Sequence, residues 1–236
     1  MIGVILAAGY GTRLRPFTKL LPKPLLPIFN KPMISFPINT LKQSGIKDIV
    51  IVVLPEHKQL FETIIGDGSL FGVDIHYVLQ HDAKGTAQAL SLVKKYTKDN
   101  IMVVCNGDNI FEAKIDLSTF TTGAHLIVRE DATPEKFGVV SVNENQVTQI
   151  EEKPTNPTSK LIVTGMYAVD STVFDKIATI QTSLRGELEI TDVFKQYIAE
   201  KKCTYTKVEG FWSDAGTFES LLESSNWANN GNTRNT

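Results

Sequence analysis

Apolar residues in the first half of the chain gather in short continuous runs, and the segments between the runs carry apolar residues at helical spacing. The runs and one mixed strand occupy residues 2–7, 49–54, 74–80 and 101–105. A run without alternating polar positions is typical of a strand that is covered on both faces. Helices are expected at 32–44 (with a kink at Pro37), 56–65 and 86–96. Strands that alternate with helices predict right-handed crossovers and a Rossmann-like, mostly parallel sheet with helices on both faces.

The pattern changes after Asp108, where strands follow one another with little helix between them. These strands are expected at 125–129, 139–142, 147–152 and 161–169, before a helix with apolar spacing over 190–198. Short consecutive strands favour a mixed or antiparallel lobe inserted into the α/β fold. We therefore expect a single domain over 1–227, with a first part at about 1–110 and a second part at about 111–227. The polar end, ANNGNTRNT at 228–236, is expected to be a disordered tail.

Composition and charge narrow the class of protein without identifying a site. The chain has 236 residues, of which 42% are hydrophobic, and a formal net charge of -2. This near-neutral balance argues against general attraction to nucleic acids or membranes, so neither is expected as a partner. No apolar run approaches the roughly 20 residues that cross a bilayer, and the chain enters a strand at once, without a basic and apolar leader. Cys105 and Cys203 are expected as reduced, buried thiols, which fits a cytoplasmic protein.

Glycines and cations come together directly after the first expected strand, in the stretch VILAAGYGTRLRPFTKLLPKPLLPI at 4–28. Ligands of open parallel sheets bind beyond the carboxyl ends of the strands, and Gly9 and Gly11 let backbone N–H groups approach an anion. The dinucleotide-binding pattern G-x-G-x-x-G is incomplete, because Leu14 stands at the position of its third glycine. The P-loop pattern is absent. The glycines alone therefore also fit a plain tight turn. Arg13 and Lys23 on a proline-stiffened loop favour a triphosphate clamp.

This opening stretch closely resembles the G-x-G-T-R-L-x-P-x-T…K-P signature of sugar-phosphate nucleotidyltransferases. The resemblance covers about residues 1–227 and continues in order through "QHDAKGTAQAL", "NGDNIF", "KFGVV", "IEEKP", "VTGMYAVD", "GELEITD" and "WSDAGT". This series is most similar to the glucose-1-phosphate thymidylyltransferases, and "GELEITD" with "EEKP" is more specific than the glycine loop. Many relatives continue with further C-terminal helices, so we expect a short form that lacks this extension.

The resemblance implies the transfer of a nucleoside monophosphate from dTTP to glucose 1-phosphate, which gives dTDP-glucose and pyrophosphate. The sugar phosphate would attack the α-phosphorus in line, and it needs no general base because the second pKa of a phosphate is about 6. The reaction needs positioning and neutralisation of charge, for which the family uses Mg2+. Alternatives are a nucleotidyltransferase for UTP or another hexose 1-phosphate and, more remotely, a non-catalytic nucleotide-sugar-binding protein or a dinucleotide-binding oxidoreductase. A homo-oligomer is also implied.

Site residues are carried over from the family position by position. Asp108 and Asp214 match the metal ligands, although each alone also fits a turn or cap. The matches to catalytic positions are Arg13, Lys23 and Lys153. The matches to nucleotide-binding positions are Leu6, Ala7, Gly9, Gly11, Thr12, Arg13, Gln80 and Gly85. The matches to sugar-phosphate-binding positions are Asn106, Asn109, Gly138, Glu152, Lys153, Val163, Thr164, Gly165, Tyr167 and Trp212, the last of which also fits a plain core tryptophan.

Two features of this assignment leave questions for the structure. Adjacent residues on a regular strand face opposite sides, so Glu152 and Lys153 can share one site only if the strand twists or ends at Pro154. Gln80 would pair with the edge of thymine or uracil. Asn106 replaces an apolar residue that relatives place toward the sugar, which leaves the identity of the hexose open.

Overall fold

The structure, a computed structural model, describes residues 1–183 and 185–232 and has the expected mixed α/β class. The chain forms two compact units that interleave along the sequence. Unit 1 comprises residues 1–83, 105–116 and the segment from Gly210 onward, and unit 2 comprises 84–104 and 117–209. The sequence predicts a single division near residue 110, with one continuous segment on either side, whereas these units consist of three segments and two.

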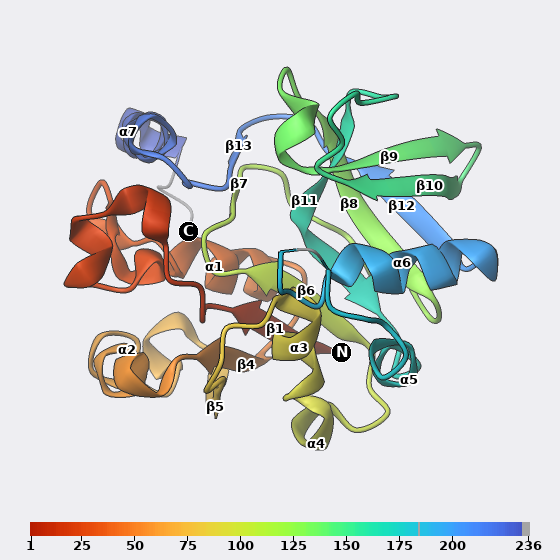
Figure 1. Cartoon of the computed structure of the whole chain (residues 1–236). Coiled ribbons are helices and arrows are strands. Elements are labelled where there is room, and N and C mark those ends of the chain that lie inside the picture. The colour runs from red at the N-terminus through yellow and green to blue at the C-terminus, as the bar shows by residue number, and fades with distance from the viewer. Residues whose placement is uncertain (184, 233–236) are drawn as a thin grey trace. The chain divides into compact units, whose positions relative to one another are not determined.

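The core of unit 1 contains three parallel strands. These are β1 (Ile2–Leu6), β4 (Asp48–Val53) and β5 (Asp74–Leu79), with β4 between the other two (Figure 1). Gly3 pairs with Ile49, and Asp48 pairs with Asp74. The apolar runs of β1 and β4 are largely buried, as their unbroken hydrophobic pattern predicts.

Helices and short ladders complete unit 1. The α-helices are α1 (Ser35–Gln43), α2 (Lys58–Ile64) and α7 (Phe218–Trp227). The single-turn helices are η1 (Thr12–Leu14), η2 (Phe17–Lys19), η3 (Lys23–Leu25), η4 (Pro55–His57) and η5 (Ser69–Phe71). The short strands are β2 (Pro27–Ile28), β3 (Lys31–Pro32), β7 (Ile110–Phe111) and β13 (Trp212–Ser213). Pro37 lies in the first turn of α1, where its missing N–H costs the helix no hydrogen bond, so no kink is required there.

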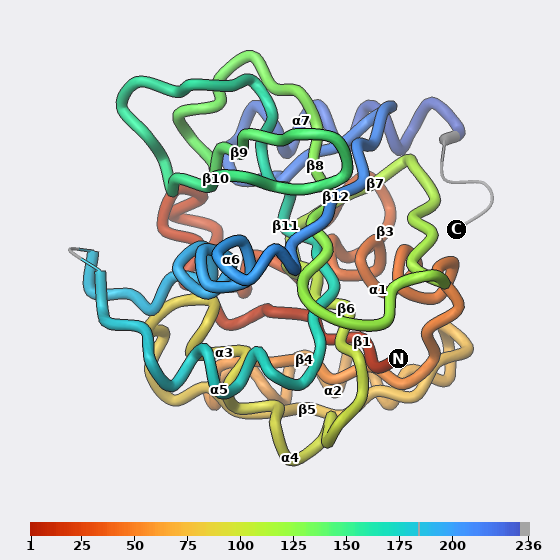
Figure 2. Tube along the Cα trace, turned by 90° about the vertical axis from the view of Figure 1, so that its right-hand side faces the viewer, coloured from red at the N-terminus to blue at the C-terminus, as the bar shows by residue number. Residues whose placement is uncertain are grey.

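Unit 2 contains five strands that close on themselves. They are β8 (Ala124–Glu130), β9 (Gly138–Asn143), β10 (Gln146–Glu152), β11 (Leu161–Val169) and β12 (Cys203–Lys207). Their order is β11-β8-β12-β10-β9, and β9 also pairs with β11 through Val139 and Ile162. Among these described strands, β8 and β12 pair in parallel and the other neighbours pair antiparallel. The mixed lobe expected after Asp108 is therefore a small closed barrel (Figure 2).

The helices of unit 2 include one of about the predicted length, α6 (Ile190–Ala199), and two where the sequence pattern predicts one. The helices are α3 (Thr86–Ser91), α4 (Lys94–Thr97), α5 (Val173–Ile177), α6 and the single turn η6 (Pro134–Lys136). The helix expected at 86–96 is thus two helices. Strand β6 (Met102–Asn106) spans the boundary between the segments of unit 2 and unit 1.

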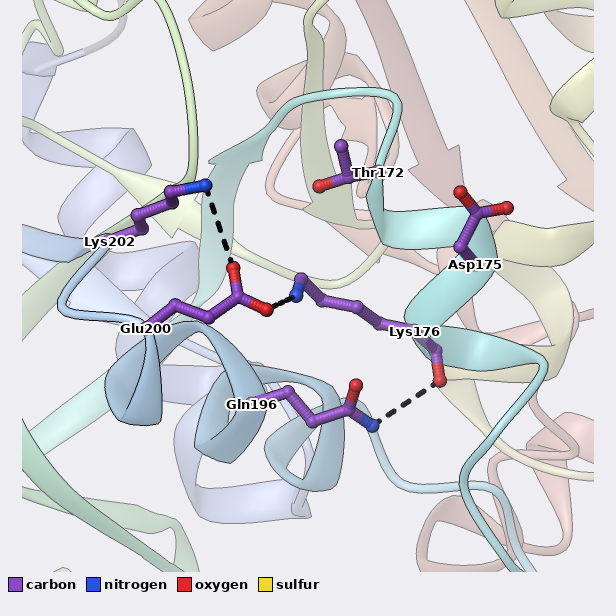
Figure 3. Close-up of a pocket in the computed structure, with 6 residues that line it drawn as sticks. All are labelled: Thr172, Asp175, Lys176, Gln196, Glu200 and Lys202. Carbon is purple, nitrogen blue, oxygen red and sulfur yellow. Dashed lines mark hydrogen bonds and ion pairs between the residues drawn. The ribbon is translucent and has the colours of Figure 1, made fainter.

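Helices α5 and α6 are joined by a polar network on the surface of unit 2 (Figure 3). Lys176 of α5 forms an ion pair with Glu200, which also faces Lys202 at 3.7 Å. The Lys176 ammonium lies 4.5 Å from the centre of the Tyr197 ring. In the lining of the hollow beside these groups, Lys176, Glu200 and Lys202 already pair with one another, so we assign this network to helix packing.

The end of the chain differs from the expected disordered tail. Residues Ala228–Asn232 continue from α7 as a turn of π-helix, with a non-helical conformation at Gly231. Ala228 is buried in an apolar cluster, and the neighbouring Trp227 ring stacks on Phe211 with a centroid distance of 4.6 Å. Apolar anchoring at Trp227 and Ala228 therefore orders a segment that composition alone marked as polar. Residues 233–236 of the expected tail lie outside the described residues.

Two further expectations concern cysteines and membranes. Cys105 and Cys203 are free and buried, as expected, and burial raises the pKa of the Cys203 thiol to about 12. No helix in residues 1–183 and 185–232 has the length and hydropathy needed to cross a bilayer.

His125 of β8 contacts two threonines of β12, and its burial leads us to expect that the stability of unit 2 depends on pH. In His125, Nδ1 lies 2.7 Å from the Thr204 hydroxyl and Nε2 lies 2.8 Å from the Thr206 hydroxyl. Burial lowers the pKa of this imidazole below its ordinary value of 6.5. Because the unfolded chain then binds the proton more readily, stability is retained above pH 6.5 and is lost as the pH falls below it.

We expect His125→Gln to reduce the loss of unfolding free energy between neutral and mildly acidic pH. Urea titrations of both proteins at several pH values measure this difference. Equal pH dependence in the two proteins would show that His125 does not contribute.

Candidate functional site

The glycine loop after β1 folds back on itself. Gly11 has a φ of 60°, and a Cβ atom there would lie 3.0 Å from Cβ of Lys23 and 3.0 Å from Cγ2 of Thr18. The Thr18 hydroxyl donates to the Gly11 carbonyl at 2.9 Å. Left-handed backbone and close approach both require glycine at this position. Leu14 is fully buried in the apolar cluster of unit 1, so the segment that carries Arg13 is anchored at its next residue.

Lys23 is a nearly buried cation at the centre of the site in unit 1. Its side chain is only 9% exposed, and its ammonium donates to Asp108 Oδ2 at 2.6 Å and to the Asp214 carbonyl at 2.9 Å. Arg13 is more exposed and lies 3.7 Å from Asp214 Oδ2. Each predicted metal ligand therefore has a cation of the glycine loop beside its carboxylate.

The short ladder of β7 and β13 brings the two aspartates together from distant parts of the chain. Ser213 pairs with Ile110, so Asp214 follows one strand where Asn109 precedes the other. Asn109 donates from Nδ2 to Asp108 Oδ1 at 2.8 Å and accepts from Trp212 Nε1 at 2.9 Å. The predicted site residues Asp108, Asn109, Trp212 and Asp214 are thus gathered at one end of this ladder.

The turn after Asp214 is tightly constrained. Ala215 has a φ of 37° although it carries a side chain, and it is fully buried in the same cluster as Leu14 and Ile110. Such strained backbone persists where the surrounding structure enforces it, often at functional sites. A Cβ atom on Gly216 would lie 2.7 Å from Arg13 Nη2 and 2.8 Å from Asp214 Oδ2. Gly216, which was not predicted as a site residue, therefore leaves the space that Arg13 and Asp214 occupy.

The donor set at Asp108 and Asp214 fits a hard divalent cation. Both are carboxylates whose side chains remain about a quarter exposed, at 24% and 27%. Mg2+ prefers oxygen ligands and usually takes one or two carboxylates together with water and substrate phosphates. Among the described residues, no three His, Cys, Asp or Glu side chains are placed to hold a metal alone. Two carboxylates beside a loop that carries two cations match this mode of binding.

A second group of predicted residues lies in unit 2, around the end of β10. The strand ends at Glu152, and Lys153 adopts a left-handed φ of 46° while its N–H donates to the Phe137 carbonyl at 3.0 Å. Lys153 Nζ lies 3.6 Å from Glu152 Oε1. The change of backbone direction before Pro154 thus brings two adjacent side chains together, as required if both serve one site.

Arg185 and Glu189 join this group, and neither was predicted from the sequence. Arg185 Nη2 lies 2.7 Å from Glu189 Oε1 and 3.3 Å from Glu152 Oε1. Glu189 is only 8% exposed and also accepts from the Ser183 hydroxyl at 2.9 Å. Burial raises the pKa of Glu152, Lys153 and Arg185 oppose this shift, and the Glu189 charge adds to it. Glu189 stands within "GELEITD" and Arg185 directly before it, which is the signal that could have indicated them.

Gly138 places no side chain beside Glu152. A Cβ atom there would lie 3.5 Å from Glu152 Oε2, 4.0 Å from Val163 and 3.4 Å from Thr191 Cγ2. The Thr191 hydroxyl is buried without a hydrogen-bond partner in the described part of the chain. An unsatisfied buried hydroxyl is costly, and the atom of Thr191 nearest the Gly138 position is its Cγ2 methyl.

The remaining predicted residues divide between the two units. Leu6, Ala7, Gly9, Thr12, Gln80 and Asn106 belong to unit 1, and Gly85, Val163, Thr164, Gly165 and Tyr167 belong to unit 2. Gln80 is buried directly after β5. A Cβ atom on Gly85 would lie 2.5 Å from the Leu188 carbonyl oxygen, which holds this turn against the "GELEITD" segment. Tyr167 is only 3% exposed, and its ring packs edge-on against Phe194 in the core of unit 2.

Comparison with known proteins gives a family for this arrangement. The family model described as "Nucleotidyl transferase" matches residues 2–230. A glucose-1-phosphate thymidylyltransferase of Neisseria meningitidis is 40% identical over 237 residues, which cover 96% of this chain and 82% of that relative. A low-salt glycan biosynthesis nucleotidyltransferase of Haloferax volcanii is 37% identical, over 94% of this chain and 64% of that protein.

Solved structures agree with this likeness. A crystal structure from Bacillus anthracis, of a protein assigned provisionally as a glucose-1-phosphate thymidylyltransferase and bound to sucrose, has a TM-score of 0.91 and 40% identity. It covers 97% of this chain, which in turn covers 95% of it. A UDP-glucose pyrophosphorylase complexed with UDP-glucose has a TM-score of 0.86 at 23% identity, over 98% of both chains. The second likeness concerns the fold alone.

Because Lys23 pairs with the candidate metal ligand Asp108, we expect its substitution to change how much Mg2+ stabilises the protein against unfolding. Lys23→Met removes the ammonium and leaves Asp108 without its cation, which we expect to cost about 1–3 kcal/mol of unfolding free energy. Mg2+ should then stabilise the variant more than the unsubstituted protein, since the ion no longer competes with an ammonium. Thermal unfolding with and without Mg2+ measures both effects. The added substitution Asp108→Asn should abolish the extra stabilisation, and an equal response of all three proteins would argue against a cation site here.

Proposed function

The chain belongs to the nucleotidyl transferase family, and from this premise we propose that it transfers thymidine monophosphate from dTTP to glucose 1-phosphate, releasing pyrophosphate. The observation that carries the proposal is the group of Lys23, Asp108, Arg13 and Asp214 in unit 1. A loop with two cations and two adjoining carboxylates suits a triphosphate that arrives with a divalent metal. In this proposal unit 1 is Rossmann-like and supplies most of the nucleotide-binding residues, and unit 2 supplies most of the sugar-binding residues.

Arg13 and Lys23 neutralise the triphosphate in this scheme. Lys23 acts as a fixed point charge because its stem is nearly buried, and Arg13 is exposed enough to turn from Asp214 toward the departing pyrophosphate. Charge moves onto the pyrophosphate as the bond to the α-phosphorus breaks, so a guanidinium there stabilises the transition state more than the ground state. Glycine N–H groups at Gly9 and Gly11 and the Thr12 hydroxyl supply further donors.

Asp108 and Asp214 would hold the magnesium ion. When bound, the ion neutralises phosphate charge and orients the α-phosphate for in-line attack. Asn109 fixes the rotamer of Asp108, and the hydrogen bond from the Gly216 N–H to Asp214 Oδ1, at 3.1 Å, orients the second carboxylate.

The group around Glu152 would bind the sugar phosphate. Glu152 is a strong acceptor for sugar hydroxyls, and Lys153 and Arg185 are cations suited to the phosphate. Gly138 and Val163 border the space beside Glu152, while Tyr167, Asn106 and Trp212 are assigned to the sugar by likeness to the family. The sugar phosphate is already an anion near neutral pH. The site therefore has to position this nucleophile and does not have to remove a proton from it.

Gln80 is assigned to the base, together with Leu6, Ala7 and Gly85. A glutamine amide can pair with the imide edge that thymine and uracil share, so a UDP-sugar nucleotidyltransferase is the second candidate. Pyrophosphate release measured with dTTP, UTP, CTP and GTP against several hexose 1-phosphates tests the proposal. We expect dTTP and UTP with glucose 1-phosphate to react, and efficient use of CTP or GTP would contradict the role of Gln80. A homo-oligomer and a cytoplasmic location stay predictions.

We expect Asp108→Asn and Asp214→Asn each to lower turnover at least about 100-fold, because the metal loses a charged ligand at the reacting phosphates. Unfolding free energy should fall by about 1 kcal/mol in Asp214→Asn, whose side chain is partly exposed, and by about 1–3 kcal/mol in Asp108→Asn, where the nearly buried Lys23 ammonium keeps only neutral acceptors. Steady-state kinetics and urea unfolding of the same preparations compare the two effects. Near-normal turnover in either variant would exclude that residue as a metal ligand.

A further inference from the structure

The cations of the group in unit 2 are already held by carboxylates of the chain. Glu152 Oε1 lies 3.6 Å from Lys153 Nζ and 3.3 Å from Arg185 Nη2, while Glu189 Oε1 holds the same guanidinium at 2.7 Å. Both cations are nevertheless accessible, since their side chains are 48% and 42% exposed. An incoming anion therefore meets two reachable cations with a shared carboxylate between them.

This arrangement disfavours the binding of a free inorganic phosphate ion to Lys153 and Arg185. A phosphate that approached Lys153 or Arg185 would replace attraction to Glu152 and would itself be repelled by that carboxylate, because like charges at these distances disfavour one another. A phosphate that carries a sugar brings hydroxyl donors as well. Those hydroxyls can donate to Glu152 when Lys153 and Arg185 turn to the phosphate. Only a sugar phosphate therefore replaces both the partners that Glu152 loses and the partner that the two cations lose.

From this geometry we propose that Glu152 is a specificity-determining residue that masks Lys153 and Arg185 against free inorganic phosphate and releases them when a sugar hydroxyl binds its carboxylate. The inference rests on the proposed function, since it assigns the ligand of this group as a sugar phosphate. It concerns discrimination between two ligands rather than the binding of one.

The local backbone supports a role that depends on position. Lys153 is held beside Glu152 only because its backbone is left-handed at φ 46°, which a lysine adopts at a cost. Regular strand geometry would have sent the lysine to the other face of β10, away from Glu152. The second oxygen, Glu152 Oε2, lies 3.5 Å from the position that a Cβ atom on Gly138 would occupy, so one oxygen faces the cations and the other faces a residue without a side chain.

The experiment compares two probes, inorganic phosphate and glucose 1-phosphate, on the full chain. Dissociation constants are measured by calorimetry or phosphorus NMR for the unsubstituted protein and for Glu152→Gln. The substitution keeps the shape and removes the charge. We expect inorganic phosphate to bind about fivefold more tightly, the scale of one or two partly exposed ion pairs, and glucose 1-phosphate to bind several-fold more weakly.

Two variants locate the effect. Glu151→Gln removes the same charge from the neighbouring position of β10, which faces away from Glu152, and should leave both constants unchanged. The double variant Glu152→Gln with Lys153→Met should lose the gain in phosphate binding. Circular dichroism and thermal unfolding confirm that each variant is folded.

Phosphate affinity that is unchanged or lower in Glu152→Gln would overturn the proposal, as would an equal gain in Glu151→Gln. Failure of the proposed function gives a different result. If the chain does not use sugar phosphates, glucose 1-phosphate would bind no better than inorganic phosphate in the unsubstituted protein, whatever the variant does.

Discussion

The ion pair of Lys23 with Asp108, supported by the Asp214 carbonyl, is the constraint around which unit 1 is organised. The ammonium is nearly buried, and its acceptors come from positions 85 and 191 residues further along the chain. A buried cation without partners is strongly destabilising, so the glycine loop, the turn at Asp108 and the turn at Asp214 must close together. Leu14, Ile110 and Ala215, which share one apolar cluster, are each next to or near a charged residue of this group. Packing and electrostatics thus fix the same three segments.

Both groups of candidate site residues follow one physical rule. Cations suited to phosphate are kept beside carboxylates of the chain, Lys23 and Arg13 in unit 1 and Lys153 and Arg185 in unit 2. Carboxylates between the cations offset their mutual repulsion in the absence of ligand. Under the proposed function, each carboxylate would take a different partner when phosphate binds, a metal ion for the aspartates and hydroxyl groups for Glu152. The strained residues Ala215 and Lys153 lie at these two places, where ordinary backbone would separate the paired side chains.

Much of the fold could be predicted from the sequence because periodicity and burial are local signals. The expected runs agree with β1, β4 and β11 to within about one residue. Closure of the barrel through Val139 and Ile162 could not be predicted, since it depends on pairing between distant strands. Within the candidate site, the resemblance to the family predicted Asp108 and Asp214. Arg185, Glu189 and Gly216 were identified from the distances between their atoms and the predicted residues. The turn at Ala228–Asn232 was not predicted, because the apolar contact of Ala228 stands in a stretch of polar residues.

The interleaved order of the segments has a consequence for biosynthesis. Unit 1 includes residues 1–83 and needs the segment that starts at Gly210, which the ribosome makes after all of unit 2. Until that segment emerges, Lys23 lacks its carbonyl partner, Arg13 lacks its carboxylate, and the cluster around Leu14 lacks Ala215 and Ala228. Unit 2 has its five barrel strands complete at Lys207. The nascent chain can therefore form its barrel first, and the glycine loop that carries Arg13 and Lys23 gains its full set of partners only when the residues beyond Gly210 have left the ribosome.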